Sequence, residues 1–158
     1  MEKYEVPYEE FKAVCLELVE SFKMFKPDVI VCVARGGMTA AHIVAKAMNL
    51  PVAFVANYDG YMTSMGLYPR TQKTAIVIDD MADQGRTFDK VRDYLTEDFE
   101  DIKFYYSAVY RVGTYTNIDL IGRVVVDKWL VMPNEESCKV TVGDKNLFSE
   151  GNSQYGTN

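Results

Sequence analysis

The sequence predicts an α/β protein in which helices flank a central, mostly parallel sheet. Segments with the character of buried strands, at residues 29–34, 51–56 and 74–78, alternate with segments of helical period. Both faces of these strands are apolar, which is typical of a parallel sheet buried between two layers of helices. No internal repeat interrupts the alternation. We therefore expect one domain over residues 1–158, with its core at about residues 28–135.

The composition excludes several classes of protein. The chain has 158 residues, 48% of them hydrophobic and 25% charged, as expected for a globular domain. A net charge of −6 argues against a nucleic-acid surface. The sequence contains no run of about 18 apolar residues, so we expect no membrane-spanning helix. Cys15 and Cys32 lack CxxC spacing and fit buried thiols in a reducing cytoplasm, so we expect a cytoplasmic protein.

The first third of the chain predicts helix, strand, turn and helix. Pro7 can begin a helix, and apolar residues then recur at helical spacing: Phe11, Val14, Cys15, Leu18, Val19 and Phe22. Pro27 ends that segment, and the strand at residues 29–34 follows. The turn Arg35-Gly36-Gly37 separates this strand from a helix of small residues at 38–48.

A long segment without clear period follows the second strand. Residues 57–73 contain glycines and tyrosines and are too long for a simple connection. Because loops of this size in compact domains are often lids or disordered, we expect a lid loop here.

The rest of the chain returns to the alternation. The strand at 74–78 is followed by a helix at 87–95 and by strands at 104–110 and 123–126. Residues 129–132 either extend the sheet or form a short edge strand. The polar tail at 150–158 is a candidate for disorder.

The most informative segment joins the strand at 74–78 to the helix after it. Asp79, Asp80 and Asp83 emerge at the carboxyl end of the strand, which is the edge where open α/β sheets bind ligands. Gly85 permits a tight turn, and Thr87 opens a helix whose free N–H groups suit a phosphate. Carboxylates beside a phosphate site suggest a ligand with diol hydroxyls, a phosphate and Mg²⁺. The alternative is an ordinary solvated turn.

Residues 77–87, Val-Ile-Asp-Asp-Met-Ala-Asp-Gln-Gly-Arg-Thr, resemble the phosphoribosyl-pyrophosphate (PRPP) motif of type I phosphoribosyltransferases. One position departs: Gln84 stands where the family usually has Thr or Ser, although its amide can also donate a hydrogen bond. The resemblance implies that Asp79 and Asp80 bind the ribose hydroxyls, directly or through Mg²⁺. It also implies a catalytic Asp83, which accepts the N7 proton of the base, and a 5′-phosphate loop made of Asp83, Gln84, Gly85, Arg86 and Thr87.

The turn Arg35-Gly36-Gly37 has a separate signal for an anion. Its glycines allow a ligand close to the backbone, and Arg35 and the following helix N-terminus both favour negative charge. Alone this is a common connection between strand and helix. The resemblance implies that it is the pyrophosphate loop, with a non-proline cis peptide near Ala34–Arg35.

Residues 127–135 resemble the carboxyl-terminal segment of xanthine–guanine type purine phosphoribosyltransferases. The resemblance implies that Trp129 stacks on the purine and that Leu130 contacts it through the backbone. The alternative for Trp129 is a core filler. Asn134 departs from the family, which usually has a second aromatic there. Arg111 lies near the position of a lysine that binds the 6-oxo group; the alternative is an ordinary surface arginine.

The expected lid also departs from the family. Residues 57–60 resemble the start of the family's flexible loop, in which an arginine soon follows and reaches the pyrophosphate. Here residues 61–68 contain no basic residue, and Arg70 and Lys73 come later as candidate substitutes.

Taken together, the resemblance implies a purine salvage enzyme. It would transfer the 5-phosphoribosyl group from PRPP to hypoxanthine, guanine or xanthine with Mg²⁺, as a homodimer or homotetramer with a small hood segment and a flexible lid. Alternatives are a PRPP-binding regulatory or accessory protein without turnover, an orotate or pyrimidine transferase, against which Trp129 speaks, and a different α/β phosphate-binding domain.

Overall fold

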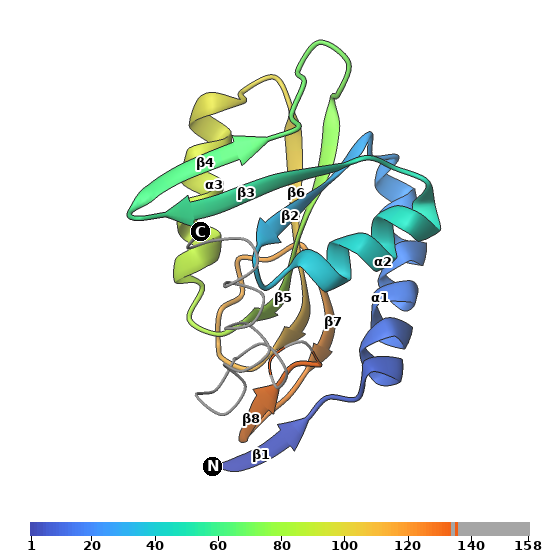
Figure 1. The fold of residues 1–158 in the computed structure, drawn as a ribbon, viewed down its shortest axis with the longest axis vertical. Helices are drawn as coiled ribbons and strands as arrows, with labels where there is room; N and C mark the ends of the chain where they lie inside the picture. The colour runs from blue at the N-terminus through green and yellow to red at the C-terminus, as the bar shows by residue number, and fades with distance from the viewer. Residues whose placement is uncertain (134, 136–158) are drawn as a thin grey trace, which may run out of the picture.

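A twisted six-stranded sheet forms the centre of the computed structural model, which describes residues 1–133 and 135 (Figure 1). The strand order is β4-β3-β2-β5-β6-β7, and β4 alone runs antiparallel to its neighbour within this sheet. The predicted α/β class is therefore confirmed. The bounds are β2 Val29–Ala34, β3 Val52–Tyr58, β4 Tyr61–Met65, β5 Thr74–Ala82, β6 Lys103–Arg111 and β7 Leu120–Val124. Asn134, Cys138 and the predicted tail at 150–158 lie outside the described residues.

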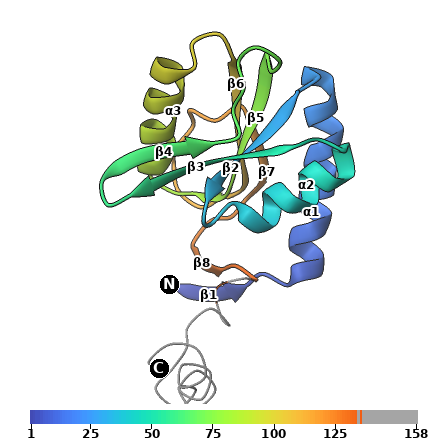
Figure 2. The same ribbon diagram turned by 45° about the horizontal axis from the view of Figure 1, so that its top comes forward.

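Helices cover both faces of this sheet. The helices α1 (Tyr8–Phe22) and α2 (Met38–Met48) lie on one face, with a short 3-10 turn η1 (Lys23–Phe25) after α1, and α3 (Arg86–Asp98) lies on the other (Figure 2). All three helices were expected, and α2 has the predicted bounds. None of the described helices has the length and apolar character needed to cross a bilayer.

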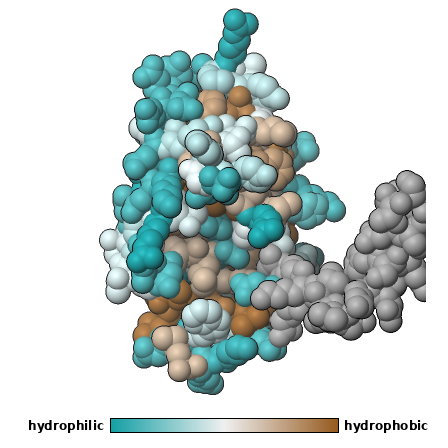
Figure 3. Space-filling view, turned by 60° about the vertical axis from the view of Figure 1, so that its left-hand side comes forward, coloured by the Kyte–Doolittle hydropathy of each residue, from teal (hydrophilic) through white to brown (hydrophobic). Residues whose placement is uncertain are grey.

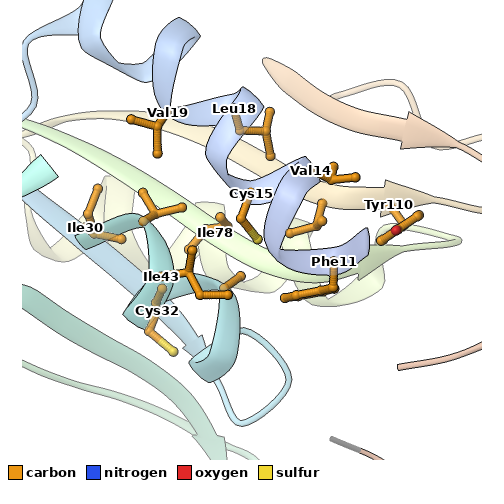
Figure 4. Close-up of a cluster of buried hydrophobic side chains, with 14 of the residues drawn as sticks. Phe11, Val14, Cys15, Leu18, Val19, Ile30, Cys32, Ile43, Ile78 and Tyr110 are labelled. Carbon is orange, nitrogen blue, oxygen red and sulfur yellow. The ribbon is translucent and has the colours of Figure 1, made fainter. Parts of the chain in front are cut away.

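Each face of the sheet has its own hydrophobic core, which explains why the strands are apolar on both sides. On the α1/α2 face, the predicted stripe of α1 joins residues of α2, β2, β5 and β6 in one core (Figure 4). On the α3 face, Phe88, Val91 and Leu95 pack against alternate residues of the same strands. Cys15 and Cys32 are buried, and burial raises the pKa of both thiols to about 12. They are core residues, as expected.

The segment expected to be a lid loop, residues 57–73, is partly a β-hairpin. Strands β3 and β4 pair antiparallel up to Tyr58 and Tyr61. Asp59 and Gly60 between them have φ values of 50° and 84°. Positive φ at both central residues is the signature of a type I′ hairpin turn, for which Asp-Gly is a preferred sequence.

A second, two-stranded sheet lies below the main one, where β1 (Glu2–Glu5) pairs parallel with β8 (Lys128–Val131) (Figure 1). Strand β1 was not predicted. The predicted strand at 123–126 is displaced: β7 covers residues 120–124, because Leu120 and Ile121 pair with Ser107 and Ala108 of β6. Most of the apolar run that suggested the later position lies in the link to β8.

Candidate functional site

Two carboxylates meet near the carboxyl end of β5. Asp79 is 8% exposed, and its Oδ1 accepts a hydrogen bond of 2.8 Å from the backbone N–H of Asp80. Burial, and then the charge of Asp80, raise the pKa of Asp79 well above its ordinary value. Burial raises the pKa of Asp80 to about 6, and the charge of Glu135 adds to the rise. Because adjacent buried carboxylates ionise at a cost, a bound cation would stabilise them.

The turn after β2 lies against these carboxylates. A Cβ atom at Gly36 would lie 3.0 Å from Asp80 Oδ1 and 3.1 Å from Asp79 Oδ1. A Cβ atom at Gly37 would lie 2.5 Å from the backbone oxygen of Ile78, so this position has no room for a side chain. Arg35 is exposed, and the peptide bond between Ala34 and Arg35 is cis, as the resemblance implied. The residues predicted for pyrophosphate and for ribose are thus neighbours.

The predicted 5′-phosphate loop connects β5 to α3. A cavity of about 280 Å³ is lined by residues 81–88, which include the whole loop. Gly85 has a φ of 80°, which favours glycine, and α3 begins at the next residue, Arg86. The first N–H groups of a helix lack partners within it and can bind an anion. Thr87 lies in this first turn.

One cavity joins the predicted catalytic residue to all three predicted base contacts. It has a volume of about 670 Å³, and its wall includes Asp83, Arg111, Trp129 and Leu130. The rest of the wall is largely apolar, with Met1, Met81, Val112 and residues 124–126, and its polar members are Thr114, Thr116, Asp127 and Lys128. Hydrophobic side chains gather in the lower half of the face in Figure 3, at the level where Figure 1 places β1 and β8. An apolar cavity with few polar groups is typical of a site for a flat organic ligand.

Two open questions about the base residues are answered by burial. Trp129 is 62% exposed and lines the cavity, so it is not a core filler. Leu130 is buried at 4% exposure. Arg111 is half-buried, and among the described residues its buried Nε has no hydrogen-bond partner. A buried donor without a partner is costly, so Arg111 is not an ordinary surface arginine.

The donor set at Asp79 and Asp80 fits a magnesium ion that arrives with a phosphate ligand. Within residues 1–133 and 135, no group of three or more His, Cys, Asp or Glu side chains is placed to hold a metal. Mg²⁺ usually keeps several waters and needs only one or two carboxylates besides substrate phosphates. Gly36 leaves open the space beside both carboxylates, as such an ion would require.

The basic residues suggested as substitutes for the lid arginine lie at the wrong edge of the sheet. Lys73 directly precedes β5, whereas Asp79 and Asp80 lie toward its far end. Its backbone N–H donates to Asp28 before β2, and its Nζ donates to the backbone oxygen of Pro69. Five strand residues span about 17 Å. The suggestion for Lys73, and for Arg70 in the preceding turn, is therefore wrong.

Several site residues had no role in the sequence prediction. Met1 and the link at residues 124–126 line the large cavity, and Gly113 lies against Asp83. Their positions depend on contacts between distant segments. For Gly113 the sequence did carry a signal, a glycine two residues after the end of β6.

Comparison with known families decides the affiliation. The family model described as the phosphoribosyl transferase domain matches residues 9–116. The chain belongs to the phosphoribosyl transferase domain family. The matched residues include the predicted 5′-phosphate loop, the turn predicted to bind pyrophosphate and Arg111, and exclude β1 and β8. The predicted family resemblance is confirmed.

Solved structures of phosphoribosyltransferases share the fold of this family member. A purine phosphoribosyltransferase from Pyrococcus horikoshii Ot3 aligns with a TM-score of 0.74 and 21% identity, over 89% of this chain and 99% of that one. The Helicobacter pylori xanthine-guanine-hypoxanthine phosphoribosyltransferase aligns with a TM-score of 0.73 and 26% identity, over 93% and 99%. Orotate phosphoribosyltransferase from Aeropyrum pernix aligns less fully, with a TM-score of 0.60 and 18% identity, over 75% and 71%.

Proposed function

We propose that this phosphoribosyltransferase-family protein transfers the 5-phosphoribosyl group of PRPP to a 6-oxopurine, giving a nucleoside 5′-monophosphate and pyrophosphate. The observation that carries the proposal is the 670 Å³ cavity, because it places Asp83 of the PRPP motif in one wall with Trp129, Leu130 and Arg111. Asp83 also lines the smaller cavity of the phosphate loop. A base in the large cavity and a phosphate in the small one would therefore meet at Asp83.

The PRPP half of the site binds through three groups of residues. Asp79 and Asp80 hold the ribose hydroxyls and a Mg²⁺ ion, the backbone of residues 83–87 binds the 5′-phosphate, and the Arg35-Gly36-Gly37 turn binds the pyrophosphate. When bound, Mg²⁺ would offset the negative charge of the leaving group. Arg35 and the turn amides act on the same charge as it develops. Binding of the remote 5′-phosphate supplies energy that positions the ribose.

In the transfer step, the C1–O bond to pyrophosphate breaks and a bond from C1 to a ring nitrogen of the base forms. The electron pair of the broken bond leaves with pyrophosphate. The base then carries an excess proton at N7, and Asp83 accepts it through its exposed carboxylate. The role of Asp83 requires a carboxylate at the junction of both cavities, which is where it lies.

Arg111 and Trp129 define the base that fits. Trp129 offers a flat, accessible ring for stacking. Arg111 lines the cavity and is a permanent donor, since its guanidinium stays charged. A donor at this place favours a 6-oxo group and disfavours the 6-amino group of adenine, which is itself a donor. The exposed ring of Trp129 and the donor of Arg111 together support hypoxanthine, guanine or xanthine as the base.

The test is pyrophosphate release from PRPP and Mg²⁺, measured separately with hypoxanthine, guanine, xanthine, adenine and orotate. We expect release and matching nucleotide formation with 6-oxopurines only. Turnover with orotate but with none of the purines would overturn the proposed base specificity. The Asp83→Ala variant, which should lose turnover, is the control for contaminating enzymes.

One observation favours a second candidate, a PRPP-binding regulatory protein without turnover. The hairpin that replaces the expected lid loop contains no basic residue, and Arg70 and Lys73 belong to the opposite edge of the sheet. Tight PRPP binding with no nucleotide formed from any base would favour this candidate. The homodimer or homotetramer and the cytoplasmic location remain predictions.

A further inference from the structure

Tyr115 lies directly on the backbone of the 5′-phosphate loop. A Cβ atom at Gly85 would overlap the Tyr115 ring, so the ring fills the space that any side chain at position 85 would need. The same ring stacks on Phe88 of α3, with centroids 6.1 Å apart and an interplanar angle of 21°. Tyr115 belongs to the connection between β6 and β7. The connection between β6 and β7 therefore packs against the 5′-phosphate loop through Tyr115.

Polar contacts fix the Tyr115 hydroxyl in place. It donates to Asp89 Oδ1 at 2.8 Å and accepts a hydrogen bond of 2.8 Å from Arg92 Nη1. Arg92 Nη2 donates to the backbone oxygen of Asn117 at 2.7 Å. The Arg92 guanidinium also lies 4.3 Å from the centroid of the Tyr106 ring. Hydrogen bonds from a charged donor are stronger than neutral ones, so α3 and the connection are held together firmly.

The same connection touches the loop at a second point. A Cβ atom at Gly113 would overlap the backbone oxygen and Oδ1 of Asp83. The backbone N–H of Val112 donates to the oxygen of Ala82 at 2.9 Å. Residues 112–117 thus contact the loop at Asp83, where it begins, and at Gly85, in its middle.

We propose that Tyr115, held by Arg92 and Asp89, is a positioning residue that keeps the 5′-phosphate loop in its binding conformation. Glycine is the most flexible residue of a chain, so a loop centred on Gly85 needs outside support to keep its amides in place. If the loop adopts its binding conformation for only part of the time, the apparent affinity of the protein for PRPP is reduced by that fraction. The expected change in the KM for PRPP rests on the proposed function, whereas the expected change in the conformational freedom of the loop does not.

The experiment combines hydrogen exchange with kinetics on the full chain. Tyr115→Phe removes the hydroxyl and keeps the ring, and Tyr115→Ala removes both. We expect faster amide exchange in a peptide covering residues 83–88, with the larger increase in Tyr115→Ala. For Tyr115→Phe we expect the KM for PRPP to rise about tenfold, which corresponds to one charge-assisted hydrogen bond. The kcat and the KM for the base should change by less than about twofold, because Tyr115 contacts neither reacting group.

Tyr94→Phe is the matched control, because it removes a hydroxyl on α3 that pairs with Ser64 Oγ at 2.8 Å, away from the loop. It should leave both readouts unchanged. Unaltered exchange and KM in Tyr115→Phe, or the same changes in Tyr94→Phe, would overturn the proposal. If the wild-type protein does not turn over PRPP, the exchange experiment still decides the role of Tyr115, and only the proposed function fails.

Discussion

Lys3 pairs with Trp129 across the small parallel sheet, so the first residues of the chain support the strand that carries the exposed Trp129 ring. A second link ties β1 to the main body. Tyr4 Oη donates to Glu10 Oε1 at 2.6 Å, and Tyr110 Oη donates to Glu10 Oε2 at 2.5 Å. Glu10 therefore joins β1, α1 and β6. We therefore expect β1 to support the proposed base site.

Breaking the pairing of β1 should weaken the binding of the base and leave that of PRPP intact. The hydrogen bond from Val6 N–H to Val131 O shows that the even-numbered residues of this segment donate toward β8. Glu2→Pro therefore removes a backbone donor that faces β8. We expect the KM for the base to rise about fivefold, in line with about 1 kcal/mol for a lost backbone hydrogen bond. Steady-state kinetics with Glu2→Ala as the control measures this. A raised KM for PRPP, or equal effects in both variants, would contradict the supporting role of β1.

The ring of Trp129 should matter for affinity and little for stability. Stacking on a base contributes about 1–3 kcal/mol, so Trp129→Ala should raise the KM for the base at least about fivefold. Because the side chain is 62% exposed, the free energy of unfolding, measured by thermal denaturation, should change by less than about 0.5 kcal/mol. Trp129→Phe retains a ring and should recover most of the affinity. A large loss of stability in Trp129→Ala would instead indicate a structural role.

Replacing Asp80 should stabilise the free protein at neutral pH while abolishing PRPP binding. The folded pKa of Asp80 is about 6, raised from 3.8, so ionisation of this group destabilises the folded state as pH rises between these values. At pH 7 Asp80→Asn should unfold with a free energy about 1–3 kcal/mol higher than wild type, and below about pH 4 the difference should vanish.

Urea unfolding at a series of pH values, without PRPP or metal, measures this effect. Asp83→Asn is the control, because its carboxyl group is exposed and its stability should stay within about 0.5 kcal/mol of wild type. A stability difference for Asp80→Asn that is independent of pH would rule out the buried carboxylate as its cause.

Arg111 should act on the choice of base. Arg111→Leu removes the donor from the cavity, and a hydrogen bond to a charged group contributes about 1.5–3 kcal/mol, so kcat/KM for hypoxanthine should fall about 10- to 100-fold. The affinity for PRPP should be unchanged, and the ratio of kcat/KM for hypoxanthine to kcat/KM for adenine should decrease. Arg123→Leu is the control, since Arg123 pairs with Glu17 at 2.6 Å outside the large cavity. Unchanged discrimination in Arg111→Leu would remove Arg111 from the base site.

Local sequence patterns predicted the parts of the fold that depend on neighbouring residues. The bounds of β2 match the prediction because its continuous apolar run lies between Pro27 and the Arg35-Gly36-Gly37 turn. The bounds of α2 match because its stretch of small residues lies between that turn and Asn49, which has a φ of 55°. The PRPP motif likewise lies within one strand, loop and helix. Its residues are close in space because they are close in the sequence.

The parts that sequence reasoning missed depend on distant partners. Strand β1 has little apolar character of its own and exists because β8 pairs with it at the other end of the chain. Tyr115 covers Gly85 through a connection that has no period to detect. The β4 hairpin is different, since Asp59-Gly60 between tyrosines carried a turn signal that the length of the segment obscured.

Calorimetric titration of PRPP in the presence of Mg²⁺ tests the central claim most directly, namely that the carboxylates and loop at the end of β5 form a PRPP site. We predict saturable binding of one PRPP per chain that requires Mg²⁺ and is lost when Asp79 and Asp80 are both replaced by Asn. Absence of binding to the folded wild-type protein, or equal binding by the double variant, would contradict the account.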